Sequence, residues 1–288
     1  MWGVNWPVMK LGLREMTPLM FRAVTMSGGF VLLFIWYRLR GARLMLAQGE
    51  LWRVAMLAAP NIVGWHALSI FGVEALASGR AAIVGFTMPI WTVLLSVVLF
   101  GERMQPRIWF ATACAALAVV LLLWHELAHL SGNPAGVAWM LAAALSWATG
   151  TLLLKRVSLG ASTEAMTLWM IGLAVPVIWL LALSIEPLPA AWPSPSGWVV
   201  IGYGALINYG IAQILWFSIA RRLPPAASAL SIMMIPLVGL ASAMPLTGER
   251  PFVADYLAAI LILVALSAVL LVGRRPRACH SSHDNRSR

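Results

Sequence analysis

Long apolar runs, separated by short polar breaks, follow one another along almost the whole chain. The runs are rich in Leu, Ala and Val and do not alternate with period two, so they predict helices rather than the strands of a barrel. In lipid, only a helix or a closed barrel satisfies its own backbone hydrogen bonds. We therefore expect an all-α integral membrane protein.

Ten such spans are predicted, and nine of them are long enough to cross a bilayer. A hydrocarbon core of about 30 Å takes about 20 helical residues, whereas the thirteen residues of the first span give only about 20 Å. Two explanations stay open: the true start lies upstream of Met1, or the first helix is shortened. The former is favoured because a half helix leaves an unfilled groove facing lipid. The approximate spans are 1–13, 18–37, 51–73, 81–100, 108–124, 136–154, 165–185, 197–220, 226–246 and 252–272.

Composition agrees with this pattern. The 288 residues are 61% hydrophobic and 10% charged, with a mean hydropathy of +0.86. A soluble domain carries roughly 25% charged residues, so the solvent of this chain is mostly lipid. The amino terminus lacks a basic segment followed by an apolar one, so we expect no cleaved signal peptide. Cys114, in an apolar run, and Cys279, in the tail, suggest no disulfide framework.

The formal charge of +10 is explained by orientation. With the amino terminus in the cytoplasm, 15 of the 20 Lys and Arg residues fall inside and 5 outside, as the positive-inside rule requires. Anionic lipid at the inner face matches this excess, so nucleic acid is not needed as a partner. We predict a multi-pass protein of the cell inner (plasma) membrane with both termini cytoplasmic.

Two stretches of the chain share key residues at a fixed distance. Pro89 lies twelve residues before Gly101-Glu102-Arg103, and Pro236 lies twelve residues before Gly248-Glu249-Arg250, so the copies are 147 positions apart. This spacing predicts an internal duplication. Further pairs at an offset of 147 or 145 are Asn61 with Asn208, His66 with Gln213, Trp2 with Trp147, and Lys10 with Lys155.

Each half of the duplication contains five predicted spans. Because five is odd, the second half enters the membrane upside down. Inverted repeats place matched residues around a pseudo-two-fold axis in the membrane plane, as in many secondary transporters. We predict a first repeat over residues 1–130 (spans one to five), a second over 131–273 (spans six to ten), and a basic disordered cytoplasmic tail over 274–288.

The ordered set of motifs resembles a known family. Trp2-Gly3 near a helix start, Lys10 at its end, the Pro89 helix running into Gly101-Glu102-Arg103, and a second copy of these units resemble the drug/metabolite transporter (DMT) superfamily. The resemblance is closest to its EamA branch of ten-helix proteins and covers residues 1 to about 272. It implies two inverted five-helix halves and export of a metabolite such as an amino acid.

Polar side chains near the middle of a span are costly in lipid and become functional candidates for that reason. Asn61 and His66 lie near the centre of span three. Asn208 and Gln213 occupy the same place in span eight. Either they line a substrate pathway, or they bond neighbouring helices at about 0.6 kcal/mol per contact. We assign them to the pathway, together with Asn5, Trp65 and Trp91.

His66 is the mid-membrane group whose proton exchange falls near neutral pH, so protons are a candidate coupling ion. A neutral, satisfied histidine is the alternative. Positions five apart on an α-helix differ by about 140°, so Asn61 and His66 would face one channel only with a wide cavity or a kink at Pro60.

Pro89 and Pro236 each remove a backbone donor in mid-span, and we predict a hinge or gate at both. Because ordinary membrane helices also contain prolines, a purely structural role stays open. The glutamates of the two Gly-Glu-Arg copies directly precede spans five and ten, where a carboxylate complements the positive helix end. We predict interfacial anchors, with gating ion pairs as the alternative, at Glu102, Arg103, Glu249 and Arg250.

These features favour a secondary active transporter of a small organic metabolite, such as an amino acid or related amphiphile, working by alternating access. Drug or cation efflux, as in the small four-helix relatives, is the first alternative, although the first span carries Asn5 and no acid. A non-transporting membrane scaffold is the second. The histidines are scattered, so we predict no enzyme, no metal and no cofactor. The expected partners are a small-molecule substrate and the lipid bilayer, in an oligomeric state that the sequence leaves open.

Overall fold

The structure, a computed structural model, describes residues 1–101, 106–128, 134–189, 191–212, 215 and 225–270, which form helices and no strand. Its elements up to residue 128 are α1 (Trp2–Gly12), α2 (Pro18–Leu39), α3 (Glu50–Ala58), the π-helix η1 (Ala59–Gly64), α4 (Trp65–Ala75), α5 (Ser78–Gly85), α6 (Met88–Phe100) and α7 (Pro106–Ala128). The later elements are α8 (Pro134–Arg156), α9 (Thr163–Ile185), α10 (Pro195–Gly202), the π-helix η2 (Tyr203–Ile211), α12 (Pro225–Thr247) and α13 (Val253–Leu270).

Local sequence signals fix many helix ends. The first residue of α2, α7, α8, α10 and α12 is proline, which suits a first helical position because the N–H there has no intrahelical partner. Ser162 and Ser194 accept hydrogen bonds from the backbone N–H groups of Ala165 and Gly197, capping α9 and α10. The spans read from the apolar runs therefore begin close to the observed helices.

The glycine of each Gly-Glu-Arg copy ends a helix. Gly101 follows α6 with a φ of 65°, and Gly248 follows α12 with a φ of 73°. A Cβ atom at either position would meet nothing within 4 Å, so the requirement for glycine is conformational. This left-handed conformation is the one that commonly terminates helices, and a side chain adopts it only at a cost.

Among the described residues, five helical stretches are long and apolar enough to cross a membrane: Pro18–Leu39, Glu50–Ala75, Ser78–Phe100, Pro134–Leu154 and Thr163–Ile185. Shorter apolar helical stretches cover Trp109–Leu122, Ile235–Thr247 and Val253–Ala268. The stretch Glu50–Ala75 contains α3, η1 and α4, and Ser78–Phe100 contains α5 and α6. The chain is thus a helical protein with several membrane-crossing segments.

One prediction about these segments was wrong. We placed Pro89 inside a continuous helix, but α5 ends at Gly85 and the turn residues Phe86 and Thr87 separate it from α6. Pro89 lies in the first turn of α6, where its missing N–H breaks no helical hydrogen bond. The helix therefore stops and restarts before the proline. Pro236, in contrast, is buried inside the uninterrupted α12.

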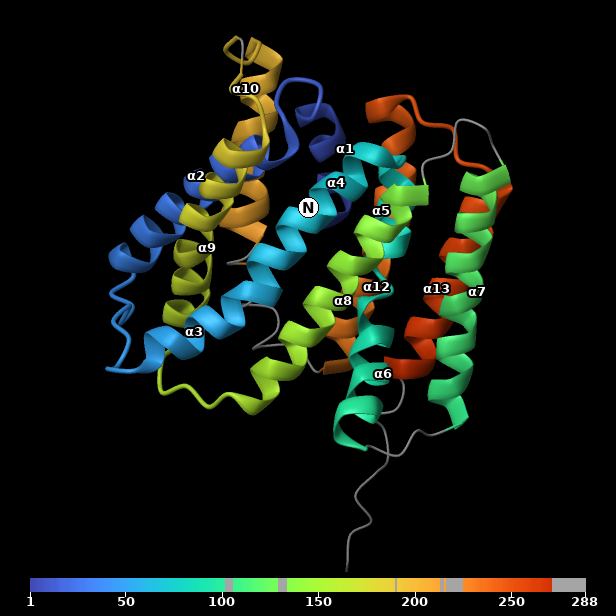
Figure 1. Ribbon diagram of the computed structural model, residues 1–288, viewed down its shortest axis with the longest axis horizontal. Helices are drawn as coiled ribbons and strands as arrows, with labels where there is room; N and C mark the ends of the chain where they lie inside the picture. Colours follow the sequence, from blue (N-terminus) through green and yellow to red (C-terminus); the bar gives the residue numbers. More distant parts are fainter. Residues whose placement is uncertain (102–105, 129–133, 190, 213–214, 216–224, 271–288) are drawn as a thin grey trace, which may run out of the picture.

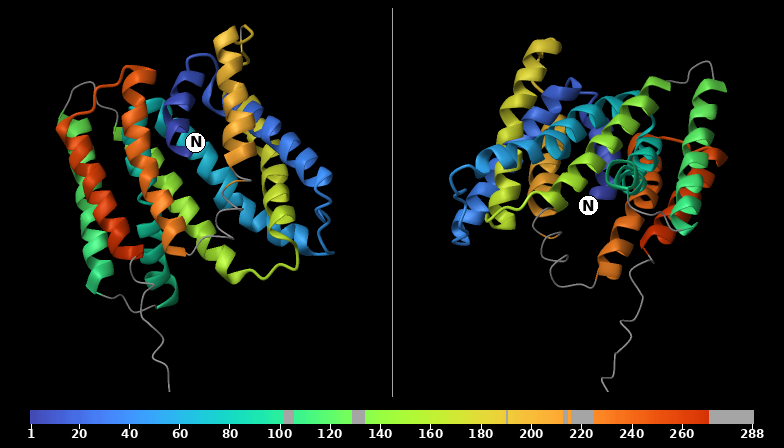
Figure 2. Two further views of the ribbon diagram at one scale, coloured as in Figure 1. Left: turned by 180° about the vertical axis from the view of Figure 1, so that it is seen from behind. Right: turned by 60° about the horizontal axis from the view of Figure 1, so that its bottom comes forward.

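The helices form one bundle, in which segments far apart in sequence lie side by side (Figures 1 and 2). At one edge α7 packs along α13, and at the opposite edge α2 packs along α9. Between them, α4 packs along α8 and α1 along α12. Each of these pairs joins a helix before residue 130 to one after it, so the core is shared by both halves of the chain.

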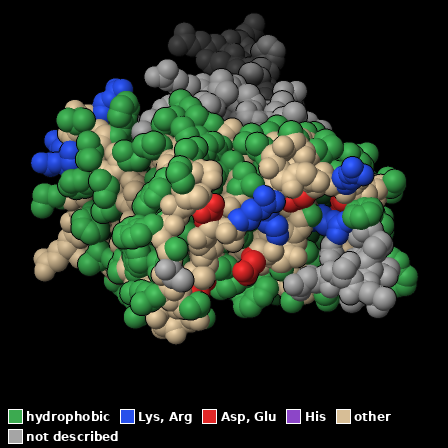
Figure 3. Space-filling view, turned by 90° about the horizontal axis from the view of Figure 1, so that it is seen from above, with side chains coloured by type: hydrophobic (Ala, Val, Ile, Leu, Met, Phe, Trp, Pro, Cys, Tyr) green, Lys and Arg blue, Asp and Glu red, His purple; other side chains and the backbone are tan. Residues whose placement is uncertain are grey.

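The surface of the bundle is largely apolar. Large hydrophobic side chains are exposed on the outward sides of α7 and α9, among them Leu117, Val120, Leu180 and Leu183. Seen from the end where α10 lies, hydrophobic side chains surround a small group of acidic and basic ones (Figure 3). Contiguous apolar surface of this extent marks a face that contacts lipid.

Candidate functional site

The two π-helices contain the paired asparagines of the sequence. Asn61 lies in η1 and Asn208 in η2, and both side chains are buried. A π-helix is rare and occurs frequently at functional sites. His66 lies just beyond η1, in α4. The two side chains contact different helices, because Asn61 packs on Gly150 of α8 and His66 lies against Tyr209 of η2.

Asn61 makes the contacts of a helix interface. Its Nδ2 donates to the carbonyl of Leu57 one turn earlier, at 2.9 Å, and its amide packs so closely on Gly150 of α8 that a Cβ there would overlap it. On the same side, Ser146 Oγ donates to the carbonyl of Pro60 at 2.9 Å. The Asn61 side chain and the Pro60 carbonyl of the first half thereby both contact α8.

A second polar cluster lies between α2, α4 and η2. Arg22 donates from Nη1 to Tyr209 Oη at 3.5 Å and from Nη2 to Ser69 Oγ at 3.3 Å. Tyr209 Oη lies 3.0 Å from His66 Nδ1. A neutral imidazole with its hydrogen on Nε2 fits this chain, because the tyrosine hydroxyl then accepts from Arg22 and donates to Nδ1. His66 is thus linked to a buried cation through one hydroxyl.

Three tryptophans form a row that includes the residue before His66. Trp65, next to His66, meets Trp147 edge-on at a centroid distance of 5.4 Å and Trp6 at 6.5 Å. The row joins α4, α8 and α1, and Asn5 is buried beside Trp6 at the start of α1. Trp91 makes a local hydrogen bond instead. Its Nε1 donates to Oγ1 of Thr87, four residues earlier in the chain, at 3.1 Å.

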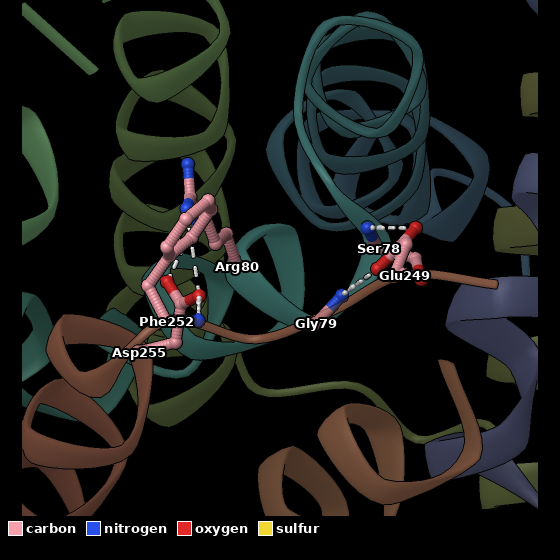
Figure 4. Close-up of polar contacts among 6 residues, drawn as sticks. All are labelled: Ser78, Gly79, Arg80, Glu249, Phe252 and Asp255. Atoms are coloured by element: carbon pink, nitrogen blue, oxygen red, sulfur yellow. Dashed lines mark hydrogen bonds and ion pairs between the residues drawn. The ribbon is translucent and has the colours of Figure 1, made fainter. Parts of the chain in front are cut away.

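Glu249 and two neighbouring charges join the halves at one end of the bundle (Figure 4). Glu249 accepts from the N–H groups of Ser78 and Gly79, at 2.8 and 3.3 Å, and so caps α5. Arg80 donates to Asp255 from Nε at 2.7 Å and from Nη2 at 3.4 Å, with its guanidinium 5.0 Å from the Phe252 ring.

The helix end that Glu249 caps differs from the one expected. Sequence reasoning put this carboxylate at the start of the span that follows it, whereas that helix, α13, is capped by Asp255, which accepts from the N–H of Phe252 at 2.7 Å. Arg250 is exposed. Because a carboxylate is favourable at any helix amino terminus, its partner cannot be read from sequence position alone.

Two further charged groups bind helix ends: Glu186 bridges the halves, and Lys10 acts within the first half. Glu186 accepts from the N–H groups of Leu19 and Met20 at the start of α2, at 2.8 and 3.0 Å. Lys10 donates to three carbonyls at the end of α4, those of Val73, Glu74 and Leu76, at 2.6 to 2.9 Å. Lys10 therefore anchors α1 to α4.

Glu15 and Glu50 make similar contacts with backbone N–H groups of the second half. Glu15 accepts from the Ser194 N–H at 3.0 Å and from its Oγ at 2.7 Å, and these hydrogen bonds hold the pKa of the Glu15 carboxyl below its ordinary value. Glu50 accepts from the N–H of Gly160 at 2.6 Å.

Several predicted positions lie outside the described residues: Gln213, Glu102 and Arg103. Among the residues that are described, no group of three His, Cys, Asp or Glu side chains could hold a metal ion. The contacts of Arg22 with Tyr209 and Ser69 were not predicted from the sequence. A lone arginine four residues into an apolar span was the available signal.

Comparisons with known proteins identify the family. The model of the EamA-like transporter family matches residues 1–124 and 134–271. The "Uncharacterized inner membrane transporter YedA" of Escherichia coli K12 is 28% identical over 94% of this chain and 87% of its own. The "Probable amino-acid metabolite efflux pump" of the same strain is 28% identical over 92% of this chain and 89% of its own.

A solved crystal structure has the same fold. It superposes with a TM-score of 0.66 and 21% identity, covering 95% of this chain and 96% of the other. The family and the named relatives indicate a multi-pass membrane transporter for a small molecule rather than an enzyme. With both matched regions together covering nearly all of its length, the chain belongs to the EamA-like transporter family of the DMT superfamily.

Proposed function

We propose that the protein is a secondary active transporter that exports a small organic metabolite, such as an amino acid or a related amphiphile, by alternating access. In this proposal ten spans form two inverted halves, both termini are cytoplasmic, and the substrate passes between the halves. The name of the efflux-pump relative supports the direction and the substrate class. Helix pairs that each join the two halves support a pathway between them.

Helix bounds support the inverted duplication. Adding 147 to the start of α5 (78), the end of α6 (100) and the start of α7 (106) gives 225, 247 and 253, which are the start and end of α12 and the start of α13. Adding 145 to the start of α2 (18) gives 163, the start of α9. Chance would not repeat these boundaries over so much of the chain.

The observation that carries the proposal is the pair of π-helices. Adding 147 to the bounds of η1 (59 and 64) gives 206 and 211, which fall within η2. A rare backbone form that is frequent at functional sites thus recurs at matched positions of the two proposed halves. Transporters built from inverted repeats have their central site where the two halves meet. We assign Asn61, Asn208 and their neighbours His66, Trp65 and Asn5 to that site.

Gating and coupling follow from the same residues. Pro236 inside α12 and the interrupted helix before Pro89 are the proposed hinges, which differ in form although they match in sequence. His66 is the proposed proton-coupling group, linked through Tyr209 to Arg22. Glu249, which caps α5 from the other half of the chain, is the proposed anchor at one end of the bundle.

Transport by purified protein in liposomes tests the proposal. With the protein amino acids as labelled probes, wild-type vesicles should accumulate at least one of them above protein-free vesicles when a pH gradient is imposed. Asn208→Ala should reduce the initial rate without lowering the yield of folded protein, and His66→Gln should remove the dependence on the gradient. Wild-type vesicles that match protein-free ones for every probe would refute transport of this class.

Labelling tests the inverted halves separately. In a background of Cys114→Ala and Cys279→Ser, single cysteines at Arg103 and Arg250 should react with an impermeant reagent from opposite sides of the membrane. Gly41→Cys serves as the control for the cytoplasmic side. Labelling of both positions from one side would contradict the duplication with inverted topology.

A further inference from the structure

Arg22 is a buried cation that contacts no acidic side chain among the described residues. It lies in α2 and is 3% exposed, and its Nε has no hydrogen-bond partner in the structure. Its two contacts are with neutral hydroxyls, at 3.3 and 3.5 Å. No carboxylate is among its contacts in the described part of the chain. A charge in this position is costly unless something compensates it, and in a membrane protein it marks a functional site.

Arg80 shows how this chain satisfies a guanidinium. Asp255 lies against the edge formed by Nε and Nη2, at 2.7 and 3.4 Å. Two N–H groups on one edge of a guanidinium match the two oxygens of a carboxylate, a geometry that favours arginine over lysine. At Arg22 the same edge makes one long hydrogen bond, from Nη2 to Ser69 Oγ, and Nε donates to no acceptor in the structure.

The groups around Arg22 select for an anion with an apolar body. Tyr209 and Ser69 are neutral, and His66 is the titratable side chain linked to the cluster, through Tyr209. Arg22 and Ser69 are buried, so water competes little for the guanidinium. Trp65 precedes His66 in α4 and begins the row of tryptophans on α4, α8 and α1. Aromatic faces of this kind suit an apolar or aromatic body.

We propose that Arg22 anchors the carboxylate of the transported solute, which docks on its Nε and Nη2 edge in the way Asp255 docks on Arg80. The inference rests on the proposed transport and narrows its substrates to amino acids and small apolar monocarboxylates, excluding the corresponding amines. Tyr209 and Ser69 position the guanidinium. The solute reaches it when η2 moves away from α2, whose Gly28 and Gly29 now pack against Ala205 and Tyr209.

Binding to the purified full chain tests the anchor. The probes are the protein amino acids, straight-chain and aryl monocarboxylates, and, for each acid that binds, its primary amide and its decarboxylated amine. A ligand that binds the folded protein raises its apparent melting temperature. Acids should raise that of the wild type, and their amides and amines should not. Arg22→Gln should weaken the apparent affinity for acids at least tenfold, and Arg22→Lys should retain part of it.

Folding and binding are separated by controls. Arg22→Gln removes an unpaired charge, so without ligand it should melt no lower than the wild type. Arg250→Gln, which changes an exposed arginine, should bind acids normally. The inference is wrong if no acid shifts the wild type, if amides or amines bind as well as acids, or if Arg22→Gln keeps the preference for acids.

Transport in liposomes distinguishes this inference from the function on which it rests. If wild-type vesicles move amines and acids alike, and Arg22→Gln vesicles do the same, transport stands and the anchor is refuted. If acids bind to the wild type through Arg22 but no probe crosses wild-type vesicles above the protein-free background, the anchor stands as a binding site and the transport proposal fails.

Discussion

Arg22 and Arg80 are both buried, lie near the amino-terminal ends of their helices, and have opposite surroundings. Arg80 has a carboxylate at 2.7 Å and an aromatic ring beside it, whereas Arg22 has two hydroxyls and an unfilled Nε. A buried ion pair fixes a structure because each partner depends on the other. A buried charge without a partner leaves binding capacity for a ligand, so the difference separates a structural arginine from a functional one.

The largest effect is expected from breaking the satisfied pair. Arg80→Gln leaves the Asp255 carboxylate buried without its cation, which should lower the free energy of unfolding by about 3–5 kcal/mol. The apparent melting temperature in detergent measures the change. Arg80→Met combined with Asp255→Leu should recover most of the loss, because both charges are then gone. A single variant as stable as the wild type would remove the contrast with Arg22.

Giving Arg22 a carboxylate partner should make it an ion-paired arginine like Arg80. Ser69 Oγ lies 3.3 Å from Nη2, so Ser69→Asp brings a carboxylate within reach of the guanidinium. The new ion pair should weaken binding of carboxylate probes about tenfold or more, equivalent to about 1.4 kcal/mol. Ser69→Asn introduces a side chain of nearly the same volume as aspartate but without the charge, and this variant should bind carboxylate probes almost normally. Equal affinities for the two variants would argue against competition for Arg22.

Removing one hydroxyl should have a smaller effect. Tyr209→Phe leaves Nη1 of Arg22 and Nδ1 of His66 without their shared partner. The loss of one such hydrogen bond is worth about 1 kcal/mol, so affinity for carboxylates should fall about fivefold. Tyr203→Phe, on the same helix, removes a hydroxyl that donates to the carbonyl of Met1 and should leave affinity unchanged. An equal loss in both variants would place the effect in helix packing.

The smallest effect concerns a half-buried carboxylate in the loop after α1. Hydrogen bonds from Ser194 hold the folded-state pKa of Glu15 below its ordinary value of 4.5. The stabilisation is therefore complete above the unfolded pKa and is lost as the pH falls through the lower folded pKa. Glu15→Gln should flatten the fall in apparent melting temperature below about pH 4.5. A wild-type profile retained by the variant would show that Glu15 adds nothing.

Helix bounds could be predicted from the sequence, but the break before Pro89 could not. Prolines and capping serines are local signals, so the span predicted at 165–185 agrees closely with α9 (Thr163–Ile185). Pro89 was misplaced because the same residue either kinks a helix or begins one. Here the backbone turns at Phe86 and Thr87, where Thr87 Oγ1 donates to the carbonyl of Val84 at 2.7 Å. That choice depends on packing around the break.

The site was readable only in part for a related reason. Asn61 and Asn208 could be proposed for the site from their matched spacing in the sequence. The Arg22 cluster could not, since it joins residues 22, 69 and 209, which occupy unmatched positions in the two halves. A side chain's partner in a bundle depends on which helices become neighbours, and apolar periodicity leaves that open.

The pairing of Arg80 with Asp255 also has a consequence for biosynthesis. The two residues are 175 positions apart, so at about 5–20 residues per second the ribosome needs roughly 9 to 35 seconds to supply the acid after the base. During that interval the nascent chain holds a cation at the lipid boundary with its counterion not yet made. The two halves synthesised as separate polypeptides should therefore yield stable protein only when they are co-expressed.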